Sequence, residues 1–282
     1  MPRLVKLGCM TSRRMDIMAP LNMHVVVGER VFPQIPALAA HSALYGPFLL
    51  GCIVVDINGF CPSPYAHRYS HTHFVERVDA IGPLVRAKSC ENFLTQLPSL
   101  VARPFPLLTD VESAFLAGYL CHLAVDEEWK HHDWHLIHER GINVWKELSV
   151  PGGVLLTAFA AASQDVFQDF SAVRAALRHV TIPDILTHIS HGALEAMWDR
   201  VKELSMSTNI AESFFQVRQA QGMSADDAAT LRKEHEQYWD EAMVVIEEYL
   251  GHPTTRLPRM TRRAVEVLPK LYQQLFTVDD GQ

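Results

Sequence analysis

Histidines and acidic residues are concentrated in one stretch of twenty-two residues, from Gly118 to Glu139. The stretch holds five of the fifteen histidines of the chain and five acidic residues, at positions 126, 127, 128, 133 and 139. Burying so many polar groups beside apolar Leu, Val and Trp is costly unless the groups are paired or share an ion. Neutral imidazole and carboxylate are the usual ligands of Zn²⁺ and similar divalent ions. The stretch therefore predicts a metal site, around which the rest of the chain must fold.

The spacing inside this stretch is helical. His122 and Asp126 are four residues apart, as are His135 and Glu139, and side chains at i and i+4 point to the same side of a helix. On one unbroken helix Asp126 and His135 would lie about half a turn apart. If both pairs serve a single site, the helix must break between them, and the polar residues 128–133 are the expected place. The alternative is a solvated, charge-rich helix end whose histidines bind nothing.

A local signal predicts where this helix starts, and the expected break contains a further candidate ligand. Thr109 and Glu112 are three residues apart, just after two prolines, and read as a capping box that starts a helix near Val111. Within the expected break, either His131 or His132 would add a further nitrogen ligand.

A second, upstream group of polar residues accompanies an apolar run. Asp56 ends the apolar part of residues 48–60, and His71 and His73 follow within residues 68–74. An acid at such a position either caps a backbone amine or binds a cation, and on its own the cap is favoured. His71 and His73 would share a face only in an extended segment, so one of them is expected to reach an ion. His24, taken alone, reads as a core histidine with a satisfied hydrogen bond.

The order of these elements resembles the zinc-dependent phospholipase C family, whose wider fold relatives include the single-strand nucleases of the P1 type. The resemblance is carried by His24, GCIVVDINGF with Asp56, SHTHF, GYLCHLAVDEEW and a following His/Glu pair, and it covers about the first half of the chain. It implies an all-α, multi-helix globular domain. It also implies a cluster of two or three zinc ions that binds and hydrolyses a phosphodiester.

The resemblance also implies ligand sets. The set around one zinc consists of Asp56, His73, His122 and Asp126. Asp126 would bridge to another ion that His24 helps to hold. The set around the remaining zinc consists of His132, His135 and Glu139, although a small shift in alignment would exchange His131 or His138 into it. In secreted phospholipases of this type the mature amino terminus itself supplies ligands, whereas twenty-three residues precede His24 here.

The implied chemistry is hydrolysis by metal-activated water. Two nearby divalent ions lower the pKa of water from about 15.7 toward ~7 and neutralise phosphoryl oxygens. Asp56 would orient the nucleophile as well as bind metal. Rival motifs are absent, since the sequence has no GxSxG, no GxxxxGK[ST], no HExxH and no CxxC. The five scattered cysteines are compatible with a reducing cytosol, and the amino-terminal residues make a poor signal peptide, so we expect a cytoplasmic protein.

Composition limits the partners. The formal net charge of −7 argues against a broad nucleic-acid surface, and no apolar run reaches the roughly 18 residues of a membrane span. The expected partner is a phospholipid headgroup ester or a small soluble phosphoester, and a cytosolic location favours the latter. The oligomeric state stays open. We expect a disordered extension at 1–20, a metal-binding helical core at 21–150, and a helical continuation or subdomain at 151–282.

The second half reads as helices with few chemical signals. Residues 154–170 are apolar on most sides and predict a core helix, while residues 224–250 begin with a Ser/Asp cap and have amphipathic spacing. We interpret four large side chains there as packing residues: Met197, Trp198, Met206 and Trp239. His188 and His191 each have an acid four residues away, but no family motif covers them, so they are interpreted as structural.

Two other functions fit parts of the pattern. His131-His132-Asp133 together with His122 and Asp126 can be read as an HD-type nucleotide phosphohydrolase. The paired His-Asp of that enzyme needs a preceding His and a distant Asp on separate helices, whereas the upstream His122 here comes with its own Asp126. A non-catalytic helical protein stapled by a metal would instead close the coordination sphere with four protein ligands.

Overall fold

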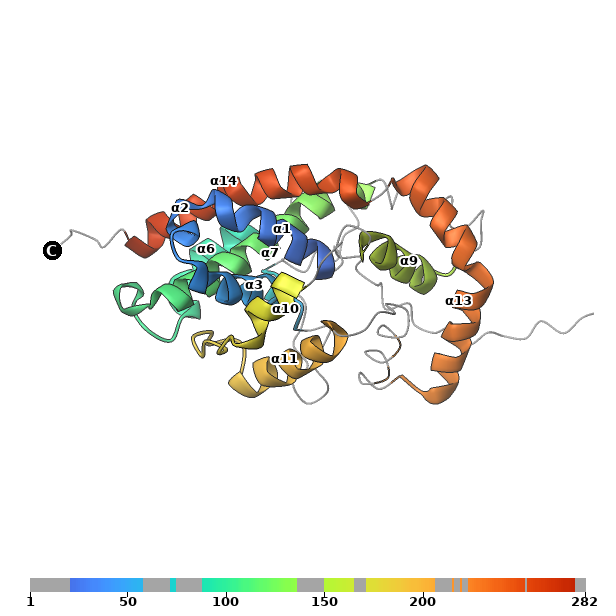
Figure 1. Ribbon diagram of the computed structural model, residues 1–282, viewed down its shortest axis with the longest axis horizontal. Coiled ribbons are helices and arrows are strands. Elements are labelled where there is room, and N and C mark those ends of the chain that lie inside the picture. Colours follow the sequence, from blue (N-terminus) through green and yellow to red (C-terminus); the bar gives the residue numbers. More distant parts are fainter. Residues whose placement is uncertain are drawn as a thin grey trace, which may run out of the picture.

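A computed structural model of the protein describes residues 21–57, 72–74, 88–135, 150–164, 171–205, 215, 219, 223–251 and 253–276. The extension expected at 1–20 lies outside these residues. The described chain is all-α, as the sequence predicts (Figure 1); its one β feature is an isolated antiparallel bridge between Val101 and Leu186. The α-helices are α1 Leu21–Val31, α2 Pro36–Ala39, α3 Tyr45–Val54, α6 Ser89–Leu100, α7 Asp110–His135, α9 Gly152–Gln164, α10 Ser171–Arg178, α11 His191–Ser205, α13 Ala225–Val245 and α14 Leu257–Phe276.

Shorter helical turns connect several of these helices. The 3-10 turns are η1 Phe32–Gln34, η2 Ser42–Leu44, η3 Phe105–Leu107 and η6 Pro253–Arg256, and a π-helical turn, η5 Ile246–Leu250, extends α13. The chain then passes through Gly251 at a φ of 72°, a conformation that glycine adopts readily.

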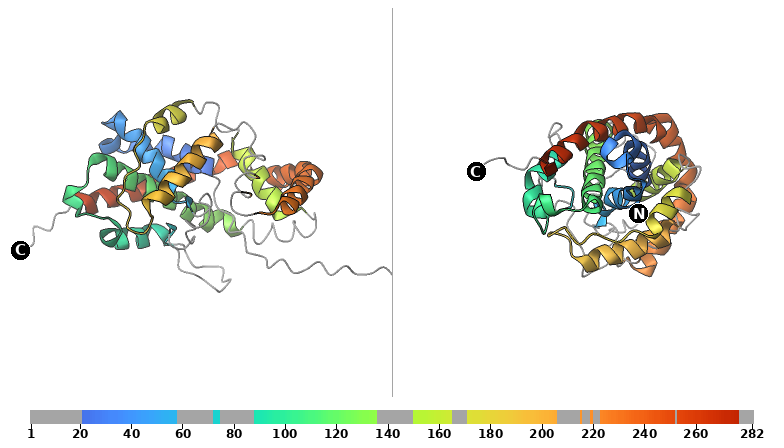
Figure 2. Two further views of the ribbon diagram at one scale, coloured as in Figure 1. Left: turned by 90° about the horizontal axis from the view of Figure 1, so that it is seen from below. Right: turned by 60° about the vertical axis from the view of Figure 1, so that its left-hand side comes forward.

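Helix α7 is the centre of the molecule. Its residues 114–127 are buried on every side, as expected for a helix that is surrounded by others rather than lying on the surface. It packs against α1, α3, α6 and α14. Figure 2 shows α1, α3 and α7 in the middle, with α14 and α11 on opposite sides of them, an arrangement that Figure 1 also shows.

The start of α7 follows the predicted capping box. The Thr109 backbone N–H donates to Glu112 Oε2 at 2.8 Å, and the Glu112 N–H donates to Thr109 Oγ1 at 3.3 Å. This exchange satisfies two of the backbone donors that a helix start leaves open. The helix begins at Asp110, one residue before the predicted start.

The predicted break in this helix is wrong. α7 runs without interruption from Asp110 to His135. The polar residues that suggested a break are satisfied on the helix surface instead. Glu128 Oε1 lies 3.2 Å from His132 Nε2, one turn further on, and 2.7 Å from Arg259 Nε of α14. Charged residues paired in this way continue a helix, since i, i+4 pairs stabilise it.

Glycines let the central helices approach closely. Gly51 of α3 faces Gly118 of α7; a Cβ on Gly51 would overlap the Phe115 carbonyl oxygen, and one on Gly118 would overlap the Phe48 carbonyl oxygen. The two backbones therefore cross in direct contact. Gly28 allows a similar, looser approach of α1, because a Cβ there would lie 3.0 Å from Cys52 Sγ of α3.

The carboxyl-terminal half agrees with its sequence pattern. The Ser224 side chain accepts from the Asp227 N–H at 3.1 Å and caps α13, as predicted. Met197 and Trp198 are buried and Trp239 packs partly buried against the core, which confirms them as packing residues; Met206 lies outside the described residues. The predicted division near residue 150 stays a prediction, although helices from both sides of it pack together, α3 with α10 and α7 with α14.

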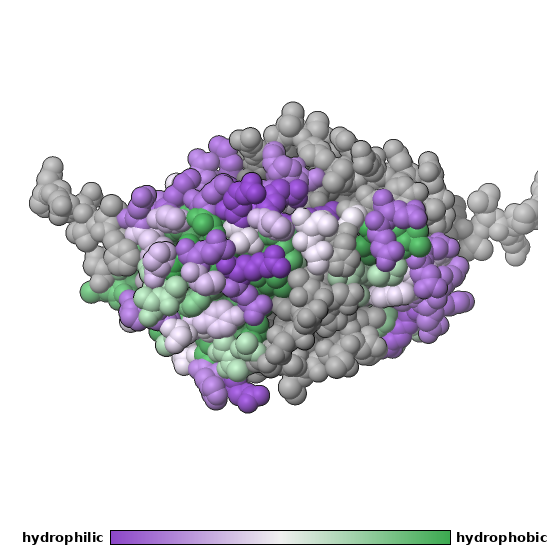
Figure 3. Space-filling view, turned by 45° about the horizontal axis from the view of Figure 1, so that its top comes forward, coloured by the Kyte–Doolittle hydropathy of each residue, from purple (hydrophilic) through white to green (hydrophobic). Residues whose placement is uncertain are grey.

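On the face shown in Figure 3, polar residues interrupt the apolar areas. The large hydrophobic side chains that are exposed in the described part are few and belong to separate elements: Leu107, Val111 and Val244. No helix among the described residues is both long and apolar enough to cross a membrane.

Candidate metal centre

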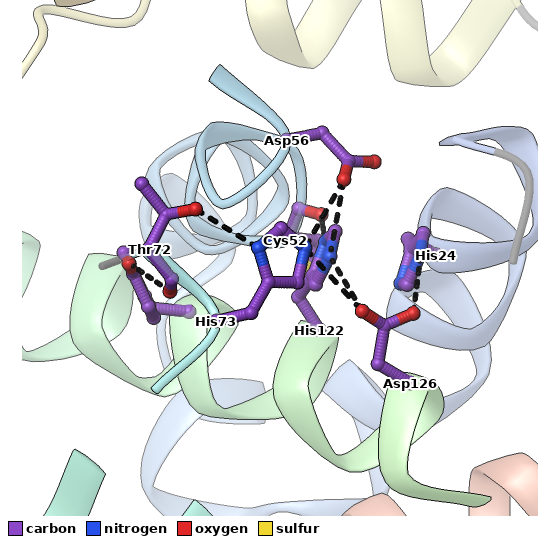
Figure 4. Close-up of polar contacts among 8 residues, drawn as sticks. His24, Cys52, Asp56, Thr72, His73, His122 and Asp126 are labelled. Atoms are coloured by element: carbon purple, nitrogen blue, oxygen red, sulfur yellow. Dashed lines mark hydrogen bonds and ion pairs between the residues drawn. The ribbon is translucent and has the colours of Figure 1, made fainter. Parts of the chain in front are cut away.

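Five His and Asp side chains from four segments meet beside the α3–α7 crossing (Figure 4). We call them the His/Asp cluster; they are His24, Asp56, His73, His122 and Asp126. α1 supplies His24, the turn directly after α3 supplies Asp56, and α7 supplies the i, i+4 pair His122 and Asp126. His73 comes from the short segment 72–74. The side chains of the cluster are buried, with exposed fractions between 0% and 4%.

Helical periodicity explains how α1 and α7 direct their cluster side chains toward one point. On α7, Gly118, His122 and Asp126 follow one another at intervals of four and lie on one face. On α1, His24 and Gly28 have the same spacing. Gly118 lets the α3 backbone come close and Gly28 makes room for the Cys52 side chain of α3, so the polar residues further along each helix lie near their counterparts.

The nitrogen–oxygen distances in the cluster suit a shared ion. His73 Nε2 lies 3.3 Å from both Asp56 Oδ1 and Asp126 Oδ2, and His122 Nε2 lies 3.7 and 3.8 Å from the same two oxygens. Ligands bound tetrahedrally to zinc at about 2.0–2.2 Å are separated from one another by about 3.3–3.6 Å. The two His73 distances fall at this separation and the two His122 distances lie slightly above it, so these nitrogens and oxygens are close enough to share an ion.

Asp126 presents its second oxygen to another histidine. Asp126 Oδ1 lies 3.5 Å from His24 Nε2, whereas Oδ2 faces His73 and His122. The two sets of ligand atoms with metal-like spacing are His24, His122 and Asp126, and Asp56, His73 and His122. The unprotonated nitrogen of a neutral imidazole offers one lone pair, so His122 Nε2 can bind one ion. The carboxylate of Asp126 can serve two.

Hydrogen bonding fixes the tautomer of His122. Its Nδ1 lies 2.7 Å from the Cys52 carbonyl oxygen, and a carbonyl only accepts, so the proton is on Nδ1 and the lone pair of the neutral ring is on Nε2. His122 Nε2 and Asp56 Oδ1 are buried and make no hydrogen bond with the described residues. Buried polar atoms of this kind are costly, and a cation between them would satisfy both.

The stacked imidazoles of His24 and His122 disfavour a double positive charge. The rings of His24 and His122 are parallel, with centroids 3.5 Å apart and an angle of 1° between their planes. Two positive charges at this separation in a buried site would repel strongly. Burial lowers the pKa of His122, which also favours the neutral form that binds metals.

The pKa values of the two carboxyl groups of the cluster are shifted in opposite directions. Burial, with the nearby charge of Asp126, raises the pKa of Asp56 to about 7. Burial alone would also raise the pKa of Asp126, but His122, Lys130 and the other histidines outweigh it and lower this pKa to about 2. Without a cation at neutral pH, Asp126 is the permanently charged member of the pair.

The other predicted ligands are placed differently. The His132 side chain is 44% exposed and pairs with Glu128; it lies about 15 Å along α7 from His122, because each residue rises about 1.5 Å. The structure does not bring it to the cluster. His135 is the last residue of α7, but its side chain is not described, and Glu139, His71 and His138 lie outside the described residues. The set His132, His135 and Glu139 stays a prediction.

Residues outside the predicted set support the cluster. Thr72 Oγ1 lies 2.9 Å from His73 Nδ1, and the Tyr119 hydroxyl donates to the Thr72 carbonyl at 2.6 Å. Tyr119 stands three residues before His122, inside the segment that carries the family resemblance, but a buried tyrosine in an apolar helix gives no signal of its role. His188, interpreted as structural, contacts the same hydroxyl at 3.4 Å.

Comparison with known proteins agrees with the geometry. The model of the zinc-dependent phospholipase C family matches residues 23–168, which is 146 of 282 residues. The matched range includes the whole His/Asp cluster. No curated protein and no solved structure is significantly similar to the chain. Because the family model covers more than half of it, the chain belongs to the zinc-dependent phospholipase C family.

Proposed function

We propose that the protein is a zinc-dependent phosphodiester hydrolase. The observation that supports the proposal is the His/Asp cluster, whose ligand atoms form two groups of three with metal-like spacing inside the range shared with the family. Zinc held there supplies Lewis acidity, which neutralises phosphoryl oxygens and lowers the pKa of water toward ~7.

Each side chain has a distinct part in this proposal. His73 and His122 would bind zinc through Nε2, and the hydrogen bond from His122 Nδ1 to the Cys52 carbonyl holds that ring in place. Asp126 would contribute to the same site, and its Oδ1, together with His24, would contribute to a second ion position. The predicted set His132, His135 and Glu139 would hold a separate ion away from the cluster, which would give the two or three ions expected.

Asp56 is the candidate proton acceptor. It can orient the water and take its proton as the oxygen attacks phosphorus in line with the leaving alcohol. The phosphorus–oxygen bond to the alcohol then breaks, and the alcohol leaves with a proton. The products are a phosphomonoester and the alcohol.

The substrate class follows from the family. A phospholipid headgroup ester or a soluble phosphodiester fits the proposal, and the predicted cytoplasmic location favours the soluble one. Two chromogenic esters separate them: bis(p-nitrophenyl) phosphate reports general phosphodiesterase activity, and p-nitrophenylphosphorylcholine reports recognition of a lipid headgroup.

A metal-dependence experiment tests the proposal. Protein purified without chelators or metal resins is analysed for zinc per chain and for hydrolysis of both esters, as wild type, Asp126→Asn and His122→Ala. His191→Ala is the matched control, because His191 and Glu195 form an exposed i, i+4 pair at 3.4 Å like that of His122 and Asp126. The proposal would be supported if Asp126→Asn and His122→Ala lost both bound zinc and activity while His191→Ala kept both. Wild-type protein without bound zinc would refute it.

A structural zinc is the second candidate. The buried cluster holds two groups of three ligand atoms with metal-like spacing, and a fourth protein ligand drawn from the neighbouring group would close a tetrahedral site with no position left for water. In that case zinc would bind tightly, its removal would unfold the protein, and neither ester would be hydrolysed. The HD-type alternative has less support, because the His132 side chain pairs with Glu128 on the exposed face of α7.

A further inference from the structure

The residue after His73 has an unusual backbone. Phe74 has a φ of 52°, in the left-handed region, and it is the one non-glycine residue with a positive φ in the described part of the chain. Phenylalanine avoids this region because its Cβ crowds the backbone. A strained residue persists only where its surroundings hold it. Its position directly after a member of the His/Asp cluster prompts a search for what holds it.

Two side chains hold the carbonyls on either side of His73. The Tyr119 hydroxyl donates to the Thr72 carbonyl at 2.6 Å, and Asn92 Nδ2 donates to the Phe74 carbonyl at 2.8 Å. Tyr119 belongs to α7 and Asn92 to α6. The backbone that carries the His73 imidazole is thus fastened to two helices, one on each side of the residue in sequence.

The Phe74 ring is fastened as well. Its centroid lies 5.3 Å from that of Phe93, 6.1 Å from that of Tyr119 and 5.6 Å from that of His188. Tyr119 in turn stacks on Phe93 at 5.0 Å with 5° between the planes. One tyrosine therefore acts twice, with its hydroxyl on residue 72 and its ring beside residue 74.

We propose that Tyr119 and Asn92 are positioning residues that hold the left-handed turn at Phe74 and so keep the His73 imidazole at the metal position. His73 Nε2 must stay 3.3 Å from both Asp56 and Asp126 to complete the coordination sphere. Without the two donors, the turn relaxes toward an ordinary conformation and the imidazole is withdrawn. This inference rests on the proposed metal site, and it assigns a role to two residues that carry no ligand atom.

Matched variants separate positioning from general support of the fold. Tyr119→Phe and Asn92→Ala remove the two donors. Tyr45→Phe is the control for the first, because the Tyr45 hydroxyl also donates to a partly buried acceptor, Glu29, at 3.1 Å. Gln34→Ala is the control for the second, because Gln34 Nε2 donates to the Arg30 carbonyl at 2.7 Å. Neither control residue belongs to the cluster.

Three measurements are made on metal-stripped protein: Co²⁺ affinity by competition with a chromophoric chelator, the visible Co²⁺ spectrum at saturation, and the metal-free melting temperature. Loss of a supporting hydrogen bond typically weakens metal binding about 10–100-fold. We expect at least tenfold weaker binding for Tyr119→Phe and Asn92→Ala. Their spectra should approach that of His73→Ala, because the same nitrogen ligand is lost. The controls should keep wild-type affinity and spectrum.

The double variant adds an internal check. Both donors hold one turn, so the combined loss of affinity should be smaller than the product of the two single losses. The positioning role would be overturned, with the metal site left intact, if Tyr119→Phe and Asn92→Ala bound Co²⁺ as tightly as wild type or no more weakly than their controls. A wild-type chain that binds no Co²⁺ would instead overturn the metal site itself.

Discussion

Gly51 of α3 and Gly118 of α7 face each other so closely that a methyl group on either would overlap the backbone of the other helix. His122 and Asp126 stand one and two turns further along α7, and Asp56 stands five residues after Gly51. The crossing therefore sets the separation of the segments from which the His/Asp cluster is built.

Gly118→Ala should force α3 and α7 apart. We expect a loss of about 1–3 kcal/mol in the free energy of unfolding, typical of overpacking, together with loss of zinc binding. Gly251→Ala is the control, since a Cβ there meets nothing and costs only the positive φ. Urea unfolding and zinc titration measure the two effects. Zinc affinity that survives Gly118→Ala would show that the crossing does not set the cluster.

Asp56→Asn should stabilise the metal-free protein at alkaline pH. The folded-state pKa of Asp56, about 7, lies above its ordinary value of 3.8 because of burial. The folded form thus binds the proton more tightly, and the stability that this gives is lost as pH rises through 7. At pH 8 the buried carboxylate costs up to about 4 kcal/mol, which asparagine avoids. The advantage should shrink toward pH 4. Melting curves of metal-free wild type and variant between pH 4 and 8 would show it, and a pH-independent difference would contradict it.

The same carboxyl should make metal binding depend on pH. Below pH 7 a cation must displace the proton of Asp56, so affinity is expected to fall by about tenfold for each pH unit. Asp126, with its pKa near 2, adds no dependence in this range. Chelator competition at pH 5.5 to 8 measures the slope. Asp56→Asn should bind weakly with a shallower slope, and an unchanged slope would assign the proton to another group.

Neutralising the neighbouring acids Asp126 and Glu127 of α7 should affect different properties, zinc binding in one case and stability in the other. Glu127 Oε1 accepts from the Cys90 N–H at 2.8 Å, and Oε2 accepts from Arg263 of α14 at 2.7 Å. Glu127→Gln should lower the free energy of unfolding by about 1–2 kcal/mol and leave zinc affinity unchanged. Asp126→Asn should abolish tight zinc binding. Parallel unfolding and zinc titrations of the two variants provide the comparison, and equal loss of zinc binding in both would contradict it.

Local chemistry made much of the fold predictable. The capping box of Thr109 and Glu112 and the cap at Ser224 involve residues three apart, so their partners are visible in sequence. The prediction of a helix break before His135 was wrong because of an assumption about distant residues. It assumed that one site uses both His/acid pairs, whereas the described part of α7 gives only His122 and Asp126 to the cluster.

The convergence of the cluster was predictable only through the family resemblance. His24 alone reads as a core histidine, and Asp56 alone reads as a cap. Their meeting depends on which helices cross, and the glycine contact that decides this involves residues 67 positions apart. The left-handed Phe74 gives no signal at all, because phenylalanine is not a residue that indicates such a turn.

α7 is buried partly by a helix that is synthesised much later, α14. α14 packs along α7 and α1, and its Arg263 completes the surroundings of Glu127, next to Asp126. The ribosome makes α14 long after the last residue of the cluster has emerged. The flank of α7 that carries Glu127 therefore stays uncovered on the nascent chain until synthesis has passed residue 276.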